Sequence, residues 1–386
     1  MIKNEIAELR RRFKIDYNAI SNIYGYYINS NKDVISTFDT SLGLMDQSET
    51  EIYLSVLKKT LSGSIGKNLI DIPFATAQVE DSPEHRLLMR LKDSQLRDEE
   101  ARTELVEKII PTVGFDEDNY LILMAADAYD LSYRDSNLED MADGGSEVFK
   151  YFICCVCPVK PSKLKLQYHT DDGEFHSTAT GSIAAFPEMG FMFPCFDDRT
   201  SNIYNALFYT KKPAFMYQEF MDEVFNIEKK PMSAPQQKVE FEDVVVETLG
   251  EECSFDVVKN LNTAMRDKVE AHKIDKIPET LELTIGQVAD VLSESGVDSS
   301  KVENFTAECQ NRFGKFALLQ PENIVDVKKL NIETPGIKIN VDPEMSNTIR
   351  TKNINGSRYI LIPASEGVEI NGMRVSPEEM QDIDEE

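Results

Sequence analysis

The sequence predicts an α+β protein, because strand-rich and helix-rich segments follow one another instead of alternating. Short β-rich runs fill residues 119–210, helical periodicity dominates 239–314, and Asn-Gly turns punctuate 324–375. The expected parts are a mixed domain with a sheet at 1–228, a helical region at 238–316, a small C-terminal β module at 322–376 and a disordered acidic tail at 377–386.

An amphipathic helix is expected near the N-terminus. Apolar residues recur with helical spacing from Ile2 to Phe13. The cations Arg10-Arg11-Arg12 fall at its C-terminal end, where they suit the helix dipole. Residues 19–38 then predict a β-hairpin, because Asn29-Ser30-Asn31-Lys32 is rich in turn-forming side chains.

Two further helices are expected before the sheet. The first covers 48–61, with Ser48 as N-cap and Glu51 completing a capping box. The second is one long helix over 84–110, which Ser82-Pro83 can begin.

The following segment has the composition of strands, broken by Gly, Pro and Asp. The turn 169–174 separates two of these strands, and a helix is expected over 214–225. The expected strands are 120–126, 149–159, 164–168, 183–186, 191–196 and 203–209.

A linker is expected at 229–237, where two prolines and small polar residues offer little to bury. The helical region after it holds a weak internal repeat: 245–251 is similar to 288–294, and 258–261 to 302–305. This pattern suggests an αα-hairpin that is duplicated once.

The C-terminal module has the pattern of hairpins. Ile337, Ile339 and Val341 alternate with polar residues, which is typical of a strand. Asn355-Gly356 and Asn371-Gly372 are strong signals for two-residue hairpin turns.

The chain is strongly acidic, with 68 Asp and Glu against 41 Lys and Arg and a net charge of −27. Such a charge favours solubility and repels nucleic acid and anionic lipid, although a local basic face could still bind nucleic acid. The N-terminus lacks the apolar region of a secretory signal. No run approaches the ~18 apolar residues that span a bilayer, so we expect a cytoplasmic protein without membrane contact.

Three of the six cysteines lie together in Cys154-Cys155-Val156-Cys157. In a strand, Cys155 and Cys157 share one face and Cys154 points to the other. Reduced, buried thiols fit this run better than a zinc site, which needs about four ligands. The sequence identifies no cofactor.

One candidate metal site combines His169 and His176 with the acids Asp171 and Asp172. In a hairpin the two histidines could face each other, and with an added carboxylate they could bind a transition metal. A solvated turn is the competing interpretation, because Asp and Gly favour turns for backbone reasons alone.

The most distinctive loop is predicted at 194–201. A strand rich in aromatic residues ends there at Asp197, Asp198 and Arg199, followed by two hydroxyl side chains. Such an array at a strand end could bind a polar ligand or a metal, or could simply cap the next element. Cys195 has no histidine nearby in the sequence, which weakens a nucleophilic role.

Several stretches carry a family resemblance over nearly the whole chain: 6–13, 59–69, 157–159, 190–194, 197–199, 247–251 and 331–335. On these stretches the chain resembles an uncharacterised family of bacterial cytosolic proteins, classed only as a domain of unknown function. That resemblance implies no activity and no catalytic residues. A fainter likeness, to the bacterial nucleoid-associated protein family, rests on the order of elements and on 336–362.

Three hypotheses for function follow. The leading one is a non-enzymatic binding or scaffold protein with a protein partner, because no set of catalytic residues converges in the sequence. The second is a metal-dependent, hydrolase-like enzyme that uses the 194–201 loop. The third is a nucleoid-associated protein.

Overall fold

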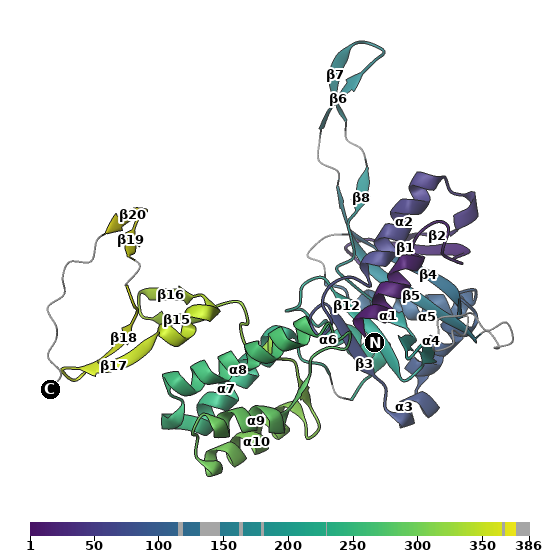
Figure 1. Ribbon diagram of the computed structural model, residues 1–386. Helices are drawn as coiled ribbons and strands as arrows, with labels where there is room; N and C mark the ends of the chain where they lie inside the picture. Colours follow the sequence, from purple (N-terminus) through teal and green to yellow (C-terminus); the bar gives the residue numbers. More distant parts are fainter. Residues whose placement is uncertain are drawn as a thin grey trace. The chain divides into compact units, whose positions relative to one another are not determined.

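The computed structural model describes residues 1–114, 119–131, 147–161, 165–178, 181–228, 230–364 and 367–375. The chain forms two compact units (Figure 1): a first unit, Met1–Lys238 with Ile277–Thr280, and a second, Val239–Lys276 with Leu281–Glu386. The predicted α+β class is confirmed by an N-terminal antiparallel sheet, a helical middle segment and C-terminal hairpins. The acidic tail 377–386 lies outside the described residues.

An antiparallel sheet organises the first unit. Its strands are Asn22–Ile28 (β1), Val34–Ser41 (β2), Leu69–Pro73 (β3), Asn119–Leu131 (β4), Glu147–Pro161 (β5), Ser182–Ala184 (β8), Met189–Phe193 (β9) and Asn205–Thr210 (β12). They are ordered β2-β1-β4-β5-β9-β12-β3, and β8 pairs with β5 off this path.

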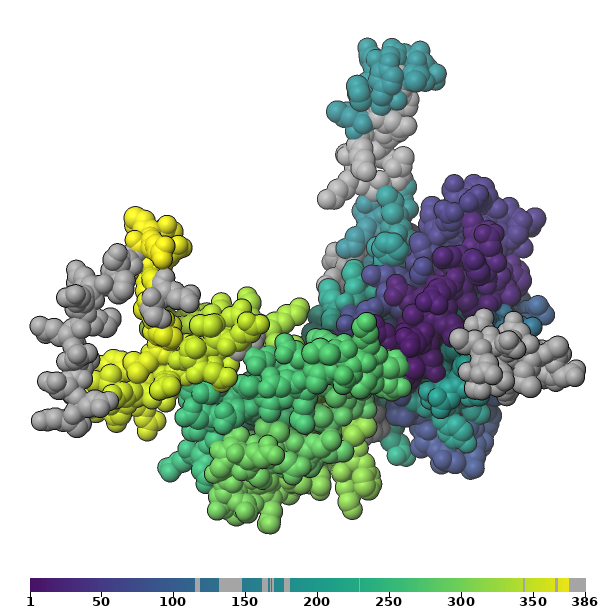
Figure 2. All heavy atoms as spheres, in the orientation of Figure 1, coloured from purple at the N-terminus to yellow at the C-terminus, as the bar shows by residue number. Residues whose placement is uncertain are grey.

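Helices cover both faces of this sheet. Two helices cover one face, and their residues form part of the purple surface in Figure 2. These are Lys3–Arg12 (α1) and Gln47–Lys59 (α2). The other face carries Pro83–Asp93 (α4), Glu99–Ile109 (α5) and a short α-helix, Gln218–Phe220 (α6), followed by a π-helical turn, Met221–Phe225. A further helix is Thr76–Asp81 (α3).

The composition of β5 follows from this burial on both faces. Cys154 packs in the core under α4 and α5, whereas Cys155 and Cys157 pack in the core under α1 and α2. A strand covered on both sides has a continuous apolar sequence, because neither set of alternating side chains meets water. The predicted split of the three thiols between the two faces is therefore confirmed.

Two details of the predicted helices are wrong. The N-cap of α2 is Asp46, which accepts a hydrogen bond from the Glu49 N–H at 2.8 Å, in place of Ser48. The expected single helix over 84–110 is two helices, because Leu96 adopts a left-handed φ of 62° and Asp98 caps a new start. Ser82 caps α4 as predicted.

The expected linker is shorter than 229–237. Helix α7 spans Ala234–Leu249 and begins inside that segment. Ser233 and Gln236 explain the early start: the Gln236 N–H donates to Ser233 Oγ (3.3 Å), and the Ser233 N–H donates to Gln236 Oε1 (3.0 Å). Two reciprocal bonds of this kind stabilise a helix N-terminus.

The second unit continues with Phe255–Ile274 (α8), Ile285–Glu294 (α9), Ser299–Phe313 (α10) and Pro321–Ile324 (α11), and Leu283–Thr284 (β13) pairs with Leu318–Leu319 (β14). The two copies of the predicted internal repeat fall on comparable positions of these helices, because Leu249 and Leu292 are both buried near helix ends. Leu261 and Phe305 are likewise buried on α8 and α10. The duplication itself stays a prediction.

Two-stranded hairpins complete the described chain. Asn355-Gly356 and Asn371-Gly372 adopt positive φ at both positions, as a two-residue hairpin turn requires. None of the described helices could cross a bilayer. The hairpins are Lys165–His169 (β6) with Glu174–Thr178 (β7), Cys195–Asp197 (β10) with Thr200–Asn202 (β11), Leu330–Thr334 (β15) with Ile337–Val341 (β16), Arg350–Ile354 (β17) with Ser357–Leu361 (β18), and Val368–Ile370 (β19) with Met373–Val375 (β20). Short 3₁₀ turns lie at Leu42–Leu44, Ile110–Thr112, Gly250–Glu252 and Pro343–Thr348.

Candidate functional site

The predicted loop at 194–201 is a β-hairpin. Strands β10 and β11 pair directly, and Asp198-Arg199 forms the turn between them. Both turn residues have a left-handed φ, 48° and 58°, which gives a two-residue turn that matches the twist of the strands. The segment predicted as a loop is therefore mostly paired strand, and only Asp198-Arg199 forms the turn at the end of β10.

This hairpin holds helix α1 through one side chain and one backbone N–H group. Arg199 Nη1 lies 3.0 Å from Glu8 Oε1, and the Asp198 N–H donates to Glu5 Oε1 at 2.8 Å. Asp197 Oδ2 accepts from the amide of Asn202 at 3.2 Å. The three predicted site residues are brought together, but their hydrogen bonds are made within the fold.

The histidine cluster lies on the β6–β7 hairpin. The strand register pairs His176 with Gln167 and His169 with Glu174, so the two histidines are diagonal neighbours and not directly opposed. His176 Nε2 lies 2.6 Å from Asp172 Oδ2. The side chain of His169 is outside the described residues. Among the side chains that are described, no group of three or more His, Cys, Asp or Glu could hold a metal ion.

The buried thiols are poor nucleophiles. Burial raises the pKa of Cys154 and of Cys195 well above the usual range, because the low-dielectric core disfavours a thiolate. The nucleophile of a cysteine enzyme is the thiolate, so these protonated groups suit packing and not catalysis.

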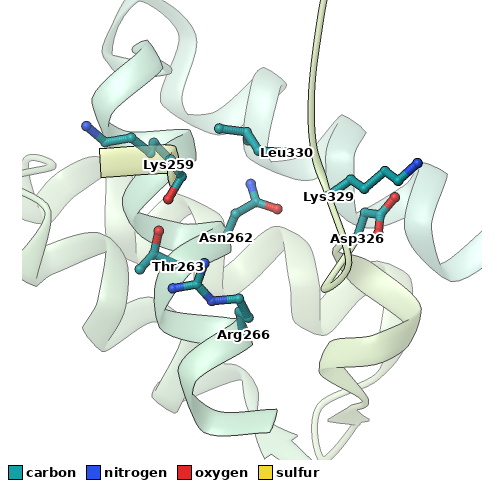
Figure 3. A pocket seen from close by; sticks show the side chains of 8 residues that line it. Lys259, Asn262, Thr263, Arg266, Asp326, Lys329 and Leu330 are labelled. Carbon is teal, nitrogen blue, oxygen red and sulfur yellow. The ribbon is translucent and has the colours of Figure 1, made fainter. Parts of the chain in front are cut away.

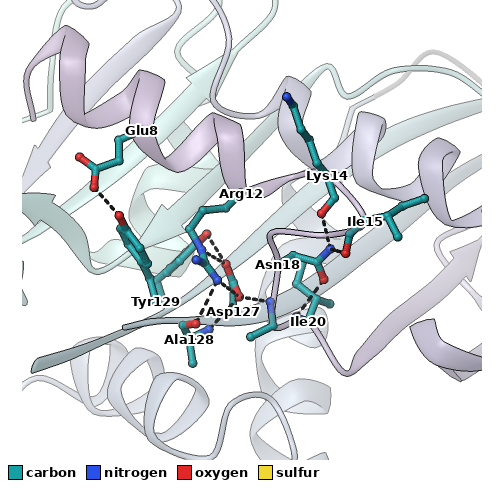
Figure 4. Close-up of polar contacts among 11 residues, drawn as sticks. Glu8, Arg12, Lys14, Ile15, Asn18, Ile20, Asp127, Ala128 and Tyr129 are labelled. Carbon is teal, nitrogen blue, oxygen red and sulfur yellow. Dashed lines mark hydrogen bonds and ion pairs between the residues drawn. The ribbon is translucent and has the colours of Figure 1, made fainter. Parts of the chain in front are cut away.

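A charged cluster that sequence reasoning missed fixes α1 to the sheet (Figure 4). The Arg12 guanidinium binds Asp127 through two contacts, Nε–Oδ2 at 2.6 Å and Nη2–Oδ1 at 3.0 Å. Asp127 is only 2% exposed and also accepts from Tyr151 Oη (2.9 Å) and the Ala19 N–H (2.8 Å). Burial, and then the charge of Asp127, raise the pKa of Tyr151 well above its usual range, so Tyr151 stays a donor.

This cluster changes the interpretation of Arg10-Arg11-Arg12. Arg12 lies with its guanidinium carbon 4.5 Å from the centre of the Tyr129 ring, and the Tyr129 hydroxyl donates to Glu8 (2.5 Å). Arg12 is therefore part of the packing between α1 and β4, and its charge is not available to a surface patch. The sequence signal was weak, because Asp127 is one of two acids near the end of a largely apolar strand and nothing distinguishes it from the other.

The β6–β7 hairpin presents a separate feature, an apolar face open to solvent. The register places Leu166, Tyr168 and Phe175 on one side, with Tyr168 opposite Phe175. Their exposed fractions are 71%, 52% and 64%. The Tyr168 and Phe175 rings lie 5.3 Å apart, so the two aromatic side chains form one patch. We call these three residues the hairpin patch.

The comparisons with known proteins identify a family and no activity. A search of curated proteins finds no match. Residues 1–373 match the family described as Domain of unknown function (DUF4317). This match agrees with the resemblance to an uncharacterised family that the sequence suggests. Because the match covers nearly all 386 residues, the chain belongs to the DUF4317 family.

Proposed function

We propose that this chain is a non-enzymatic binding protein that contacts a protein partner through the hairpin patch. The observation that carries the proposal is the exposure of Leu166, Tyr168 and Phe175 on one side of β6–β7. Exposed, contiguous apolar side chains mark interaction surfaces more often than isolated ones do. Aromatic residues are also enriched among those that dominate binding energy.

The alternation of apolar and polar side chains along β6–β7 supports a partner protein that covers one face of the hairpin. His176, next to Phe175, lies on the opposite side and binds Asp172 in the turn. Alternation of apolar and polar positions is typical of a strand with one face buried and one solvated. A lone two-stranded hairpin is marginally stable in water, so contact with an apolar surface of another protein would also stabilise β6–β7.

The other two hypotheses receive less support. A hydrolase centred on Asp197, Asp198 and Arg199 would need these side chains free to meet substrate, whereas the Arg199 guanidinium binds Glu8 and the Asp197 carboxylate accepts from Asn202. Nucleoid association is disfavoured by the net charge of −27, which repels phosphate backbones. A cytoplasmic setting in a bacterium is part of the proposal. The cysteines form no disulfides among the described residues, and most of them are buried, which suits a reducing compartment.

Site-specific photo-crosslinking tests the proposal. A photoreactive phenylalanine analogue replaces Phe175 in the full chain, which is irradiated in native lysate. We expect one dominant crosslinked protein, because the patch would lie inside the interface. The triple variant Leu166→Ser, Tyr168→Ser, Phe175→Ser should weaken the same complex by about 30-fold or more, since a single anchor residue can contribute about 2 kcal/mol or more.

The matched control places the same analogue at Glu174, one residue away and on the other side of the strand. This position should give little or no adduct. Equal crosslinking from 174 and 175, or a complex whose affinity survives the triple substitution, would contradict an interface on the hairpin patch. Circular dichroism of each variant confirms that the remaining sheet is intact.

A further inference from the structure

The hairpin β17–β18 is a cationic surface in an acidic chain. Residues 345–365 contain three cations, Arg350, Lys352 and Arg358, and no Asp or Glu. The whole chain, by contrast, holds 68 acids against 41 cations. Positive charge is therefore gathered locally on this hairpin. A local field of this kind attracts an anionic partner even though the net charge of the chain is negative.

One side of the hairpin combines this charge with apolar surface. The register pairs Arg350 with Leu361 and Lys352 with Tyr359. Positions two apart on a strand point to the same side, so the two pairs share one face. All four residues are exposed, Leu361 by 39% and Tyr359 by 48%. We call these four residues the cationic face. It suits a partner that carries both acidic and apolar side chains.

The cations of this face are not compensated within the described part of the chain. On the preceding hairpin, β15–β16, Lys338 pairs with Glu333 at 2.9 Å. Neither Arg350 nor Lys352 has such a partner among the described side chains. An isolated two-stranded hairpin is also only marginally stable in water, so a bound segment would stabilise β17–β18 as well as neutralise it.

The cations of α8, in the same unit, form no comparable surface. Lys259 Nζ lies 3.2 Å from Asp256 Oδ1, and Arg266 Nη2 lies 3.0 Å from Asp267 Oδ1. Figure 3 shows the pocket that this helix lines, with the amino group of Lys259 pointing away from its middle. The pocket volume of about 20 Å³ has room for about one water molecule, so it is too small for a ligand.

We propose that the cationic face binds the acidic tail 377–386 of the same chain. The tail carries six acids, no cations and the apolar residues Met380 and Ile383. Its carboxylates complement the two cations of the face, and its apolar side chains complement Tyr359 and Leu361. The docked tail excludes other polyanions from this face.

The chain is long enough for this contact. Val375, at the end of β20, pairs with Val368, which follows Leu361 by seven positions. An extended chain spans at most about 3.6 Å per residue and paired strands lie about 5 Å apart, so Val375 is within about 30 Å of Leu361. The chain from Val375 to Glu386 can span about 36 Å. Because such a tether gives an effective concentration of about 1 mM, even the modest ion pairs of an exposed surface can hold the tail.

Photo-crosslinking of the purified full chain tests the contact. A photoreactive phenylalanine analogue replaces Tyr359, and mass spectrometry of the digested product locates the adduct. We expect the adduct on the peptide that contains 377–386, at the mass of one chain and with a yield independent of protein concentration. The matched control carries the analogue at Thr351, which is exposed and lies between the two cations on the opposite side of the strand. It should give at least about fivefold less adduct, because its side chain points away from the cationic face.

Charge variants of the chain that carries the analogue at 359 test the cause of the contact. The double variant Arg350→Gln, Lys352→Gln should lower the yield of the tail adduct about threefold or more, because both ion pairs are lost. Raising the salt from about 0.05 M to about 0.5 M should have a similar effect, because it screens exposed charges. Lys276→Gln removes an exposed cation elsewhere in the same unit and should change the yield less than about 1.5-fold. A yield that the double substitution leaves unchanged, or an adduct that joins two chains, would overturn the proposal.

Nucleic acid is the competing occupant, because cations beside an aromatic side chain also suit single strands. A gel shift of the full chain with single-stranded DNA at about 0.15 M salt, near one Debye length of 8 Å, distinguishes the two. We expect no shift, because the tail occupies the cationic face and the net charge of −27 repels DNA. A shift that the double variant Arg350→Gln, Lys352→Gln abolishes would assign the face to nucleic acid and contradict docking of the tail.

Discussion

Replacing Asp127 with alanine should lower the unfolding free energy of the first unit by about 3–5 kcal/mol, the usual cost of breaking a buried ion pair from one side. The variant leaves the Arg12 guanidinium, whose side chain is 14% exposed, without its carboxylate. It also removes the acceptor of Tyr151 Oη and of the Ala19 N–H. The chain has no Trp, so urea unfolding followed by circular dichroism is the appropriate measurement.

Two further variants test whether the buried Arg12–Asp127 ion pair causes the expected loss of unfolding free energy. Asp81→Asn breaks an exposed ion pair with Arg86, in which the Asp81 and Arg86 side chains are 87% and 59% exposed. This substitution should lower the unfolding free energy by at most about 1 kcal/mol. The double variant Arg12→Met, Asp127→Leu should recover only the part of the loss that comes from the unpaired Arg12 charge, because Tyr151 Oη and the Ala19 N–H still lack their acceptor. A loss for Asp127→Ala no greater than for Asp81→Asn would contradict the assigned role.

Elements whose cause is local in sequence could be predicted. The split of Cys154 from Cys155 and Cys157 follows from strand alternation alone, and both cores contain the expected thiols. The Asn355-Gly356 turn follows from the ease with which these two residues adopt positive φ. Ser82 caps α4 through a hydrogen bond that spans only three residues.

Features that depend on distant residues could not be predicted. Arg12 and Asp127 are separated by 115 positions, and nothing in either segment indicates its partner. The sequence of the Asp198-Arg199 turn is that of an exposed polar array. Its partners Glu5 and Glu8 cannot be read from the sequence, because they come close only after α1 packs on the sheet.

Replacing Phe305 with alanine should destabilise the second unit by about 3–5 kcal/mol, because truncation of a buried phenylalanine leaves a cavity that neighbours fill only in part. Phe305 on α10 has no exposed surface, and its ring lies 6.1 Å from that of Phe241 on α7 in an edge-to-face arrangement of 88°. This pair connects the first helix of the unit to the last long one. Hydrogen exchange of peptides from α9 and α10 measures this loss directly.

The control for Phe305→Ala is Val246→Ala on α7, where the side chain is 59% exposed and truncation should change stability by less than about 0.5 kcal/mol. Hydrogen exchange in β4 and β5 should be unchanged in Phe305→Ala, because those strands belong to the first unit. In Asp127→Ala, exchange should become faster in β4 and β5 and stay unchanged in α9 and α10. Faster exchange throughout the chain in both variants would mean that the two units unfold as one cooperative body. Separate responses would show that each core is stable on its own, because each substitution alters the packing of a single unit.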